Sequence, residues 1–194
     1  MPEEIEVDTD KLREAIDEEI EKKSASLLRS IALTTAFFAA LAALGSLLAG
    51  GTINEALALK TEATQKQAQA SDQWAYYQAK GIKAAILEAQ KGLLVADGKP
   101  ASPDLDKTLQ RYADEQKAAS VQAQELEKAR DRKDDEANEL IHHHHLYAYA
   151  VAMLQVSIAL GAVAALTRKR FVWWGSSALG LMGGALCLWT WAAG

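Results

Sequence analysis

Three long apolar blocks constrain this chain more than any other feature of its sequence. Each is about as long as the roughly 20 residues that a helix needs to cross a bilayer. Arg29, near the start of the first block, is the only charged residue inside any of them. We therefore expect three transmembrane helices, at residues 27–50, 146–166 and 171–193.

The segment that precedes the first block is acidic, with ten Asp or Glu against four Lys or Arg in residues 1–24. A cleaved signal peptide would begin with a basic region, so the first block is predicted to be an uncleaved anchor. Residues 1–26 are predicted to form an acidic cytoplasmic helix. Its apolar stripe is thin and its polar face is not basic, which favours a solvated extension or an oligomer contact over a helix on the membrane surface.

The positions of the short basic flanks predict the orientation in the membrane. Lys22, Lys23 and Arg29 precede or begin the first block, and residues 167–170 (TRKR) form the whole predicted turn between the second and third. The positive-inside rule places these flanks in the cytoplasm. The N-terminus is then cytoplasmic, and residues 51–145 and the C-terminus lie outside, which in a bacterium with two membranes means the periplasm.

Residues 51–145 are predicted to form a helical hairpin, because they are rich in Ala, Gln, Lys and Glu. The main break is the turn at 96–104, which holds Gly98 and two of the three prolines, Pro100 and Pro103. The predicted fold is thus an all-α membrane protein, with three transmembrane helices and a long antiparallel, coiled-coil-like hairpin outside the membrane between the first and second.

Both arms of the hairpin carry stripes at heptad spacing. The stripe of the second arm continues into the second block, which predicts one helix from about Asp104 to near Thr167. The small side chains of the first arm are expected to allow close helix approach, with pairing in the hairpin and between protomers to stabilise both arms. The second arm's stripe is Leu105, Leu109, Tyr112, Gln116, Ala119, Ala123, Leu126, Arg130, Lys133, Ala137, Leu140 and His144, and the first arm's is Ala68, Ala75, Ala79, Ile82, Ile86, Ala89 and Leu93.

An aromatic string, ASDQWAYYQAK, stands out in the first arm. Trp74 and Tyr77 share one helix face, and Lys80 lies one turn beyond Tyr76, within reach of a cation–π contact. Two interpretations remain open: a binding patch for a partner or ligand, and aromatic anchors for helix packing.

Small residues recur at every fourth position in the apolar blocks and favour close helix packing and assembly. In the third block they include Gly180 and Gly184. Gln155 is the one strongly polar residue near the middle of a block. It is expected to form an interhelical hydrogen bond or, in a symmetric assembly, to line a pathway.

The four histidines of the chain are consecutive, at 142–145, where the second arm enters the second block. Consecutive helical residues point about 100° apart, so the four rings cannot converge on one ion. We expect a polar collar at the membrane surface, with only His144 on the heptad stripe and, as the sharper hypothesis, sensitivity to pH. Glu139 and His142 form a weak Glu-x-x-His motif, which would need further metal ligands such as Glu55 or a second copy.

The aromatic string, together with LQVSIAL followed by TRKR and an apolar C-terminal block, resembles an uncharacterised bacterial inner-membrane family known only as a domain of unknown function. The resemblance covers the chain from the first block to the end. It implies a multi-spanning membrane protein with a helical region outside the membrane, and it transfers no catalytic residues.

No phosphate-binding loop, dinucleotide fingerprint, nucleophile elbow or cysteine pair occurs in the sequence, so we expect neither an enzyme nor a cofactor. A net charge of −5 without a basic patch outside the membrane flanks argues against nucleic-acid binding. The expected partners are membrane lipid and further copies of the chain, and an unidentified protein is a further candidate partner. The leading hypothesis is a non-enzymatic oligomeric scaffold, and the alternative is a channel formed by symmetric assembly.

Overall fold

The computed structural model describes residues 9–100 and 102–193, and this part of the chain is all-helical. Helix α1 is Thr9–Ala96, α2 is Pro103–Thr167 and α3 is Arg170–Ala193. The prediction of an all-helical fold with a long hairpin is confirmed, as is one continuous helix from about residue 104 to Thr167. The predicted N-terminal helix is present from Thr9 on, while residues 1–8 lie outside the described part.

Helix α1 runs without interruption through the first apolar block and into the hairpin. Gly50 and Gly51, at the end of that block, do not break it. Glycine lowers helix propensity by only about 1 kcal/mol per residue, which the strong helix formers on both sides offset.

The turn between α1 and α2 contains two standard helix caps. Gly98 has a positive φ of 71°, its N–H donates to the carbonyl of Val95, and the N–H of Lys99 donates to the carbonyl of Leu94. This is the Schellman arrangement, which favours glycine at that position. The Oγ of Ser102 accepts a hydrogen bond from the N–H of Asp104 at 3.3 Å, so Ser102 caps the N-terminus of α2 and Pro103 occupies its first position.

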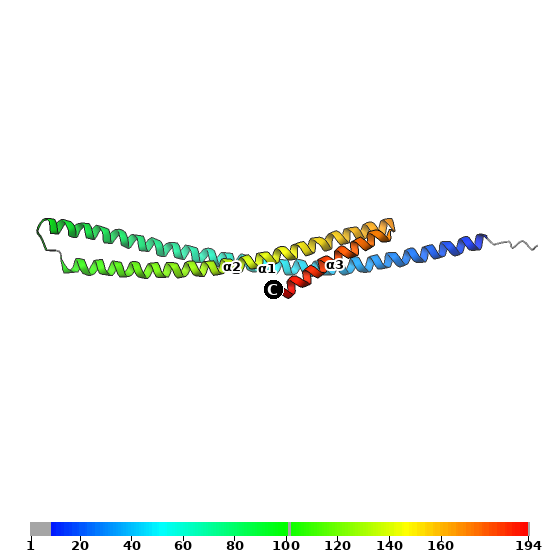
Figure 1. Ribbon diagram of the computed structural model, residues 1–194, viewed down its shortest axis with the longest axis horizontal. Coiled ribbons are helices and arrows are strands. Elements are labelled where there is room, and N and C mark those ends of the chain that lie inside the picture. The colour runs from blue at the N-terminus through cyan, green and yellow to red at the C-terminus, as the bar shows by residue number, and fades with distance from the viewer. Residues whose placement is uncertain (1–8, 101, 194) are drawn as a thin grey trace, which may run out of the picture. The chain divides into compact units, whose positions relative to one another are not determined.

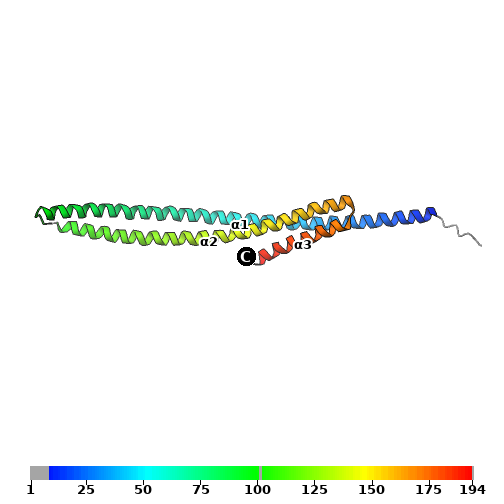
Figure 2. The ribbon, with the colours of Figure 1, turned by 45° about the horizontal axis from the view of Figure 1, so that its top comes forward.

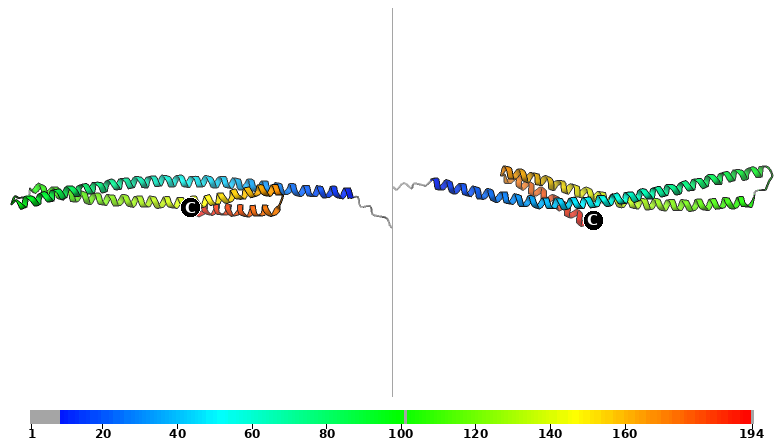
Figure 3. Two further views of the ribbon diagram at one scale, coloured as in Figure 1. Left: turned by 90° about the horizontal axis from the view of Figure 1, so that it is seen from above. Right: turned by 180° about the vertical axis from the view of Figure 1, so that it is seen from behind.

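The chain divides into two compact units. The hairpin unit is Asn54–Ile141, and its two helical segments lie side by side and antiparallel (Figures 1 and 2). The span unit comprises the described residues up to Ile53 and those from His142 on, where α3 lies along α1 and α2 (Figure 3).

In the hairpin unit, the stripe predicted for α2 is the face that packs against α1. All of its positions are buried or half-buried, and Ala119, Ala123 and Ala137 are at most 3% exposed. The stripe proposed for α1 is wrong as the packing face. Ile82 and Ile86 are each 62% exposed, whereas the buried residues of α1 in this unit are Ala56, Ala63 and Ala70.

In the span unit, small residues allow the three helices to approach closely. The Oγ of Ser157 on α2 donates to the carbonyl of Ser176 on α3 at 2.6 Å, and the Oγ of Ser176 donates back to the carbonyl of Ser157 at 2.7 Å. Both serines are buried. Phe38 of α1 is only 3% exposed and lies over Gly180, where a Cβ would come within 2.4 Å of its ring.

The outer surface of the span unit is strongly apolar. Leu33, Leu47, Leu166, Phe171 and Trp174 are all more than 60% exposed. The described residues contain three helices that are long and apolar enough to cross a membrane, judged by length and composition. These features are compatible with a multi-pass membrane protein, since such side chains are stable in contact with lipid.

Candidate interaction surface

Lys80 lies at the centre of a cluster that joins the two arms of the hairpin. Its Nζ is 2.5 Å from the Oε2 of Glu115, 4.8 Å from the ring centroid of Tyr76 and 5.1 Å from that of Tyr112. The hydroxyl of Tyr76 also donates to Glu115, at 3.3 Å. We call Tyr76, Lys80, Tyr112 and Glu115 the Lys80 cluster. Its ammonium group is held by one carboxylate and two aromatic faces.

Trp74 forms a second link between the arms, just before the Lys80 cluster in the sequence. Its Nε1 donates to Glu127 at 2.9 Å, and its ring packs edge-on against Tyr77 at 5.6 Å. The side chain of Gln116 donates to the backbone carbonyl of Tyr77 at 3.2 Å and lies against Gly81. Trp74 and Tyr76 thus contribute polar bonds across the hairpin, which fits the interpretation of the aromatic string as packing anchors.

The Lys80 cluster shifts the titration of its two charged members. The hydrogen bond from Lys80 lowers the pKa of Glu115 below its ordinary value of 4.5. The hydrogen bond to Glu115 and, secondarily, to Tyr76 raises the pKa of Lys80 above 10.5. A lowered acid pKa stabilises the fold above 4.5 and loses this contribution as the pH falls through the lowered value. A raised lysine pKa stabilises it below 10.5 and loses this contribution as the pH rises through the raised value.

Acid should therefore loosen the hairpin partly through Glu115. We expect amide hydrogen exchange in residues 54–141 to accelerate as the pH falls below 4.5, after correction for intrinsic exchange. Glu115→Gln should exchange faster than the parent at neutral pH and accelerate less in acid. Glu125→Gln, at an exposed position on the same helix, should follow the parent. If Glu115→Gln also followed the parent across the range, the cluster would not stabilise the hairpin.

Further polar contacts connect the arms, and the heptad pattern of the sequence does not predict them. Lys60 donates to Asp134 at 2.5 Å and to Asn138 at 2.8 Å. In each pair the two residues lie at similar distances along the chain from the turn at Gly98, as an antiparallel hairpin requires. This equal distance from the turn could have predicted the pairs from the sequence, but only if the exact register of the turn had been known. The remaining pairs are Gln67 with Arg130, Glu62 with Lys133, and Lys91 with Asp106.

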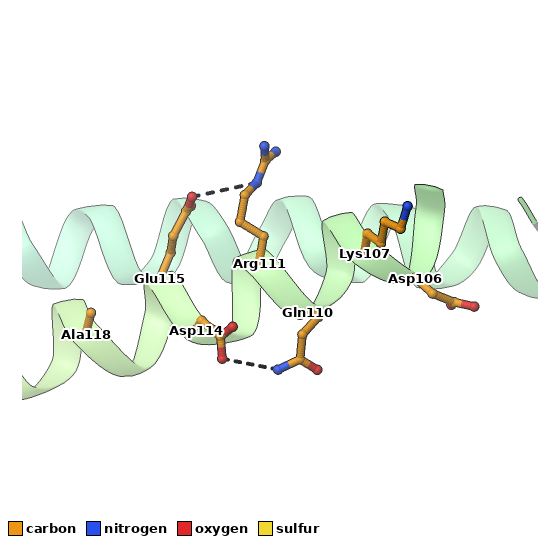
Figure 4. Close-up of a pocket in the computed structure, with 7 residues that line it drawn as sticks. All are labelled: Asp106, Lys107, Gln110, Arg111, Asp114, Glu115 and Ala118. Atoms are coloured by element: carbon orange, nitrogen blue, oxygen red, sulfur yellow. Dashed lines mark hydrogen bonds and ion pairs between the residues drawn. The ribbon is translucent and has the colours of Figure 1, made fainter. Parts of the chain in front are cut away.

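The outward faces of the two arms differ in chemistry. On α2 an open surface depression is lined by Asp106, Lys107, Gln110, Arg111, Asp114, Glu115 and Ala118. Figure 4 shows these side chains spread along the helix, with Arg111 reaching Glu115 and Gln110 reaching Asp114. On α1, by contrast, Ile86 is 62% exposed and Leu93 is 71% exposed on one face of the helix. The most apolar outward face of the hairpin therefore lies on the half of α1 near the turn.

His144 contacts α1 within the span unit. Its Nδ1 is 2.9 Å from the carbonyl oxygen of Ala49, so the ring nitrogen is the donor. A neutral histidine with its proton on Nδ1 and a charged histidine can both donate this bond. The hydrogen bond to Ala49 can therefore form whether or not His144 is charged. His142 and His145 are exposed.

The other candidate residues are distributed over the two units. Gln155 is exposed on the outside of the span unit, while Gly180 and Gly184 are buried inside it. A Cβ at Gly184 would contact Leu41 at 3.4 Å, so these two glycines serve packing within one chain. Glu55 and Glu139 are exposed. Among residues 9–100 and 102–193, no group of three or more His, Cys, Asp or Glu side chains is placed to hold a metal ion.

The fold defines a class of all-helical proteins. Three helices of the described part are long and apolar enough to cross a membrane, and two of them continue into a hairpin whose arms are joined by polar contacts. The chain belongs to the family described as Domain of unknown function (DUF4337), whose model matches residues 27–193. The resemblance noted in the sequence to a family of unknown function is thereby confirmed. No curated protein and no solved structure matches the chain.

Proposed function

We propose that this chain is a non-enzymatic, oligomeric membrane protein that presents its hairpin as a scaffold or interaction surface. One observation carries the proposal: large aliphatic residues outside the predicted spans face solvent on α1. Ile82, Ile86 and Leu93 share one face of the helix and are each more than 60% exposed. A contiguous apolar patch on a polar element is typical of a protein interaction site.

The contacts between the arms support the same proposal. The fully buried residues of α1 in the hairpin unit are alanines, and Lys60, Lys80 and Trp74 add polar contacts to α2, whereas the large aliphatic residues of the outward face take no part. These contacts position the patch on a preformed helix, so a partner would not need to order it on binding. Preorganisation of this kind lowers the entropic cost of association.

The proposed setting is the inner membrane of a bacterium, with the N-terminus in the cytoplasm and the hairpin and C-terminus in the periplasm. The basic turn at Arg168 and Lys169 supports this orientation, because short basic loops remain on the cytoplasmic side. Trp189 and Trp191 near the other end of α3 are 60% and 65% exposed, as residues at a membrane interface would be.

The assembly can be tested by measuring the mass of the purified full chain in mild detergent. We expect a uniform species at a multiple of the chain mass of 21.0 kDa, after subtraction of bound detergent. The species should persist on dilution, because a specific interface and not the detergent micelle holds it together. A uniform monomer over the same range of concentration would contradict the oligomeric scaffold.

A further inference from the structure

The heptad stripe found in the sequence of α1 lies, from Ala75 on, on the opposite side of the helix from the face that packs against α2. Its members alternate at spacings of four and three residues, which is the pattern of a coiled-coil seam. Every one of them is exposed in the hairpin unit. They are Ala75, Ala79, Ile82, Ile86, Ala89 and Leu93, and we call them the α1 stripe.

The residues that flank the α1 stripe are small or uncharged, apart from one lysine. On one side lie Tyr76, Lys83 and Gln90, and on the other lie Gln78, Ala85 and Gly92. The outward face of α2 is instead covered by acidic and basic side chains (Figure 4). A partner helix that packs on the α1 stripe must be apolar along the contact, and it must carry no positive charge opposite Lys83. The α1 stripe itself meets both conditions.

We propose that the α1 stripe pairs with the same stripe of a second copy, with the two helices parallel. The parallel direction rests on the proposed function, because copies anchored in one membrane with one orientation project their hairpins the same way. In such a pair each seam residue meets its own counterpart, so that Ile86 packs against Ile86 of the partner subunit. Lys83 then faces Gln78 of the partner subunit, and no like charges oppose each other.

The length of the α1 stripe fits a contact between tethered copies. From Ala75 to Leu93 it extends about 27 Å, at ~1.5 Å per residue. Three of its six positions are alanines, which offer little apolar surface, whereas a specific interface between free proteins buries roughly 1,000 Å². Copies held in one membrane meet at a high effective concentration, so a smaller contact suffices. A second copy is the expected partner, because all copies are anchored in the same membrane.

Disulfide cross-linking of the full chain in membrane vesicles tests this pairing. Cys187, the only cysteine, is first replaced by alanine, and single cysteines are then introduced at Ile82 or Ile86. Glu88→Cys and Gln122→Cys, at exposed positions off the stripe on α1 and on α2, are the matched controls. We expect roughly tenfold more dimer from Ile82→Cys and Ile86→Cys than from either control, because a disulfide requires Cα atoms within about 7 Å.

Each outcome separates the pairing from the proposed function. If the mass measurement shows an oligomer but the stripe cysteines cross-link no better than Glu88→Cys, the pairing is overturned and the scaffold stands. A monomer overturns both. A product heavier or lighter than two chains overturns the second copy as the occupant. Cross-linking of Ile82→Cys with Ala89→Cys in mixed vesicles, without self-linking of either, overturns the parallel direction.

Discussion

Gly180→Ala is expected to destabilise the packing of the span unit by about 1–3 kcal/mol, the usual cost of overpacking a core. A Cβ at this position would lie 2.4 Å from the Cε2 of Phe38, far inside the ordinary contact distance. Phe38 is 3% exposed, so its ring has little room to move away. Thermal unfolding in detergent, followed by the near-ultraviolet signal of the tryptophans in α3, should show a midpoint lowered by about 2–4 °C per kcal/mol.

Gly175→Ala on the same helix is the matched control. A Cβ there meets nothing within 4 Å, so the variant should unfold at or slightly above the temperature of the parent. Phe38→Leu should partly rescue Gly180→Ala, because it removes the atoms that clash, and the double-mutant cycle would report the coupling. Equal midpoints for Gly180→Ala and Gly175→Ala would show that α1 and α3 do not meet at Gly180.

Trp74→Ala is expected to destabilise the hairpin unit by about 2 kcal/mol, roughly half of what truncating a fully buried tryptophan costs. The variant loses both the bond to Glu127 and the packing against Tyr77. Amide hydrogen exchange in residues 54–141 should accelerate about 30-fold at positions that open with the hairpin. Residues of the span unit should be unaffected.

Two further variants separate the contributions of Trp74. Trp74→Phe keeps most of the ring and loses the bond to Glu127, so it should cost about 1 kcal/mol, the usual net value of a hydrogen bond. Val121→Ala, at a half-exposed position on α2, should leave exchange close to the parent's. If Trp74→Ala also exchanged like the parent, Trp74 would not anchor the hairpin and the binding-patch interpretation would gain support.

The sequence predicted the packing face of α2 correctly and that of α1 incorrectly, for one physical reason. On α2 the heptad stripe holds Ala119, Ala123 and Ala137 among charged neighbours, so apolar spacing alone identifies the face. On α1 the most exposed aliphatic residues, such as Ile86, point away from α2, and the fully buried residues of the packing face are alanines. Hydrophobic periodicity selects the most apolar face of a helix, and on α1 that is the outward one.

The Lys80 cluster could be predicted only in part. The contact of Lys80 with Tyr76 follows from their spacing of one helical turn and is present. Glu115 and Tyr112 come from the other arm, and their placement depends on the register that the caps at Gly98 and Ser102 impose. A shift of one residue in that turn would bring different side chains to Lys80. The packing partners of Gly180 and Gly184 could not be predicted either, because their spacing does not distinguish packing within a chain from packing between chains.

We propose that three spans hold the chain in a membrane, with the hairpin on one side and the basic turn on the other. Labelling of single cysteines by a membrane-impermeant maleimide tests it directly, in spheroplasts of a bacterial host and in the Cys187→Ala background. Lys99→Cys, in the hairpin turn, should be labelled in intact spheroplasts. Lys169→Cys, between α2 and α3, should be labelled only after permeabilisation. Equal labelling of both positions before permeabilisation would show that the hairpin turn and the basic turn do not lie on opposite sides of the membrane.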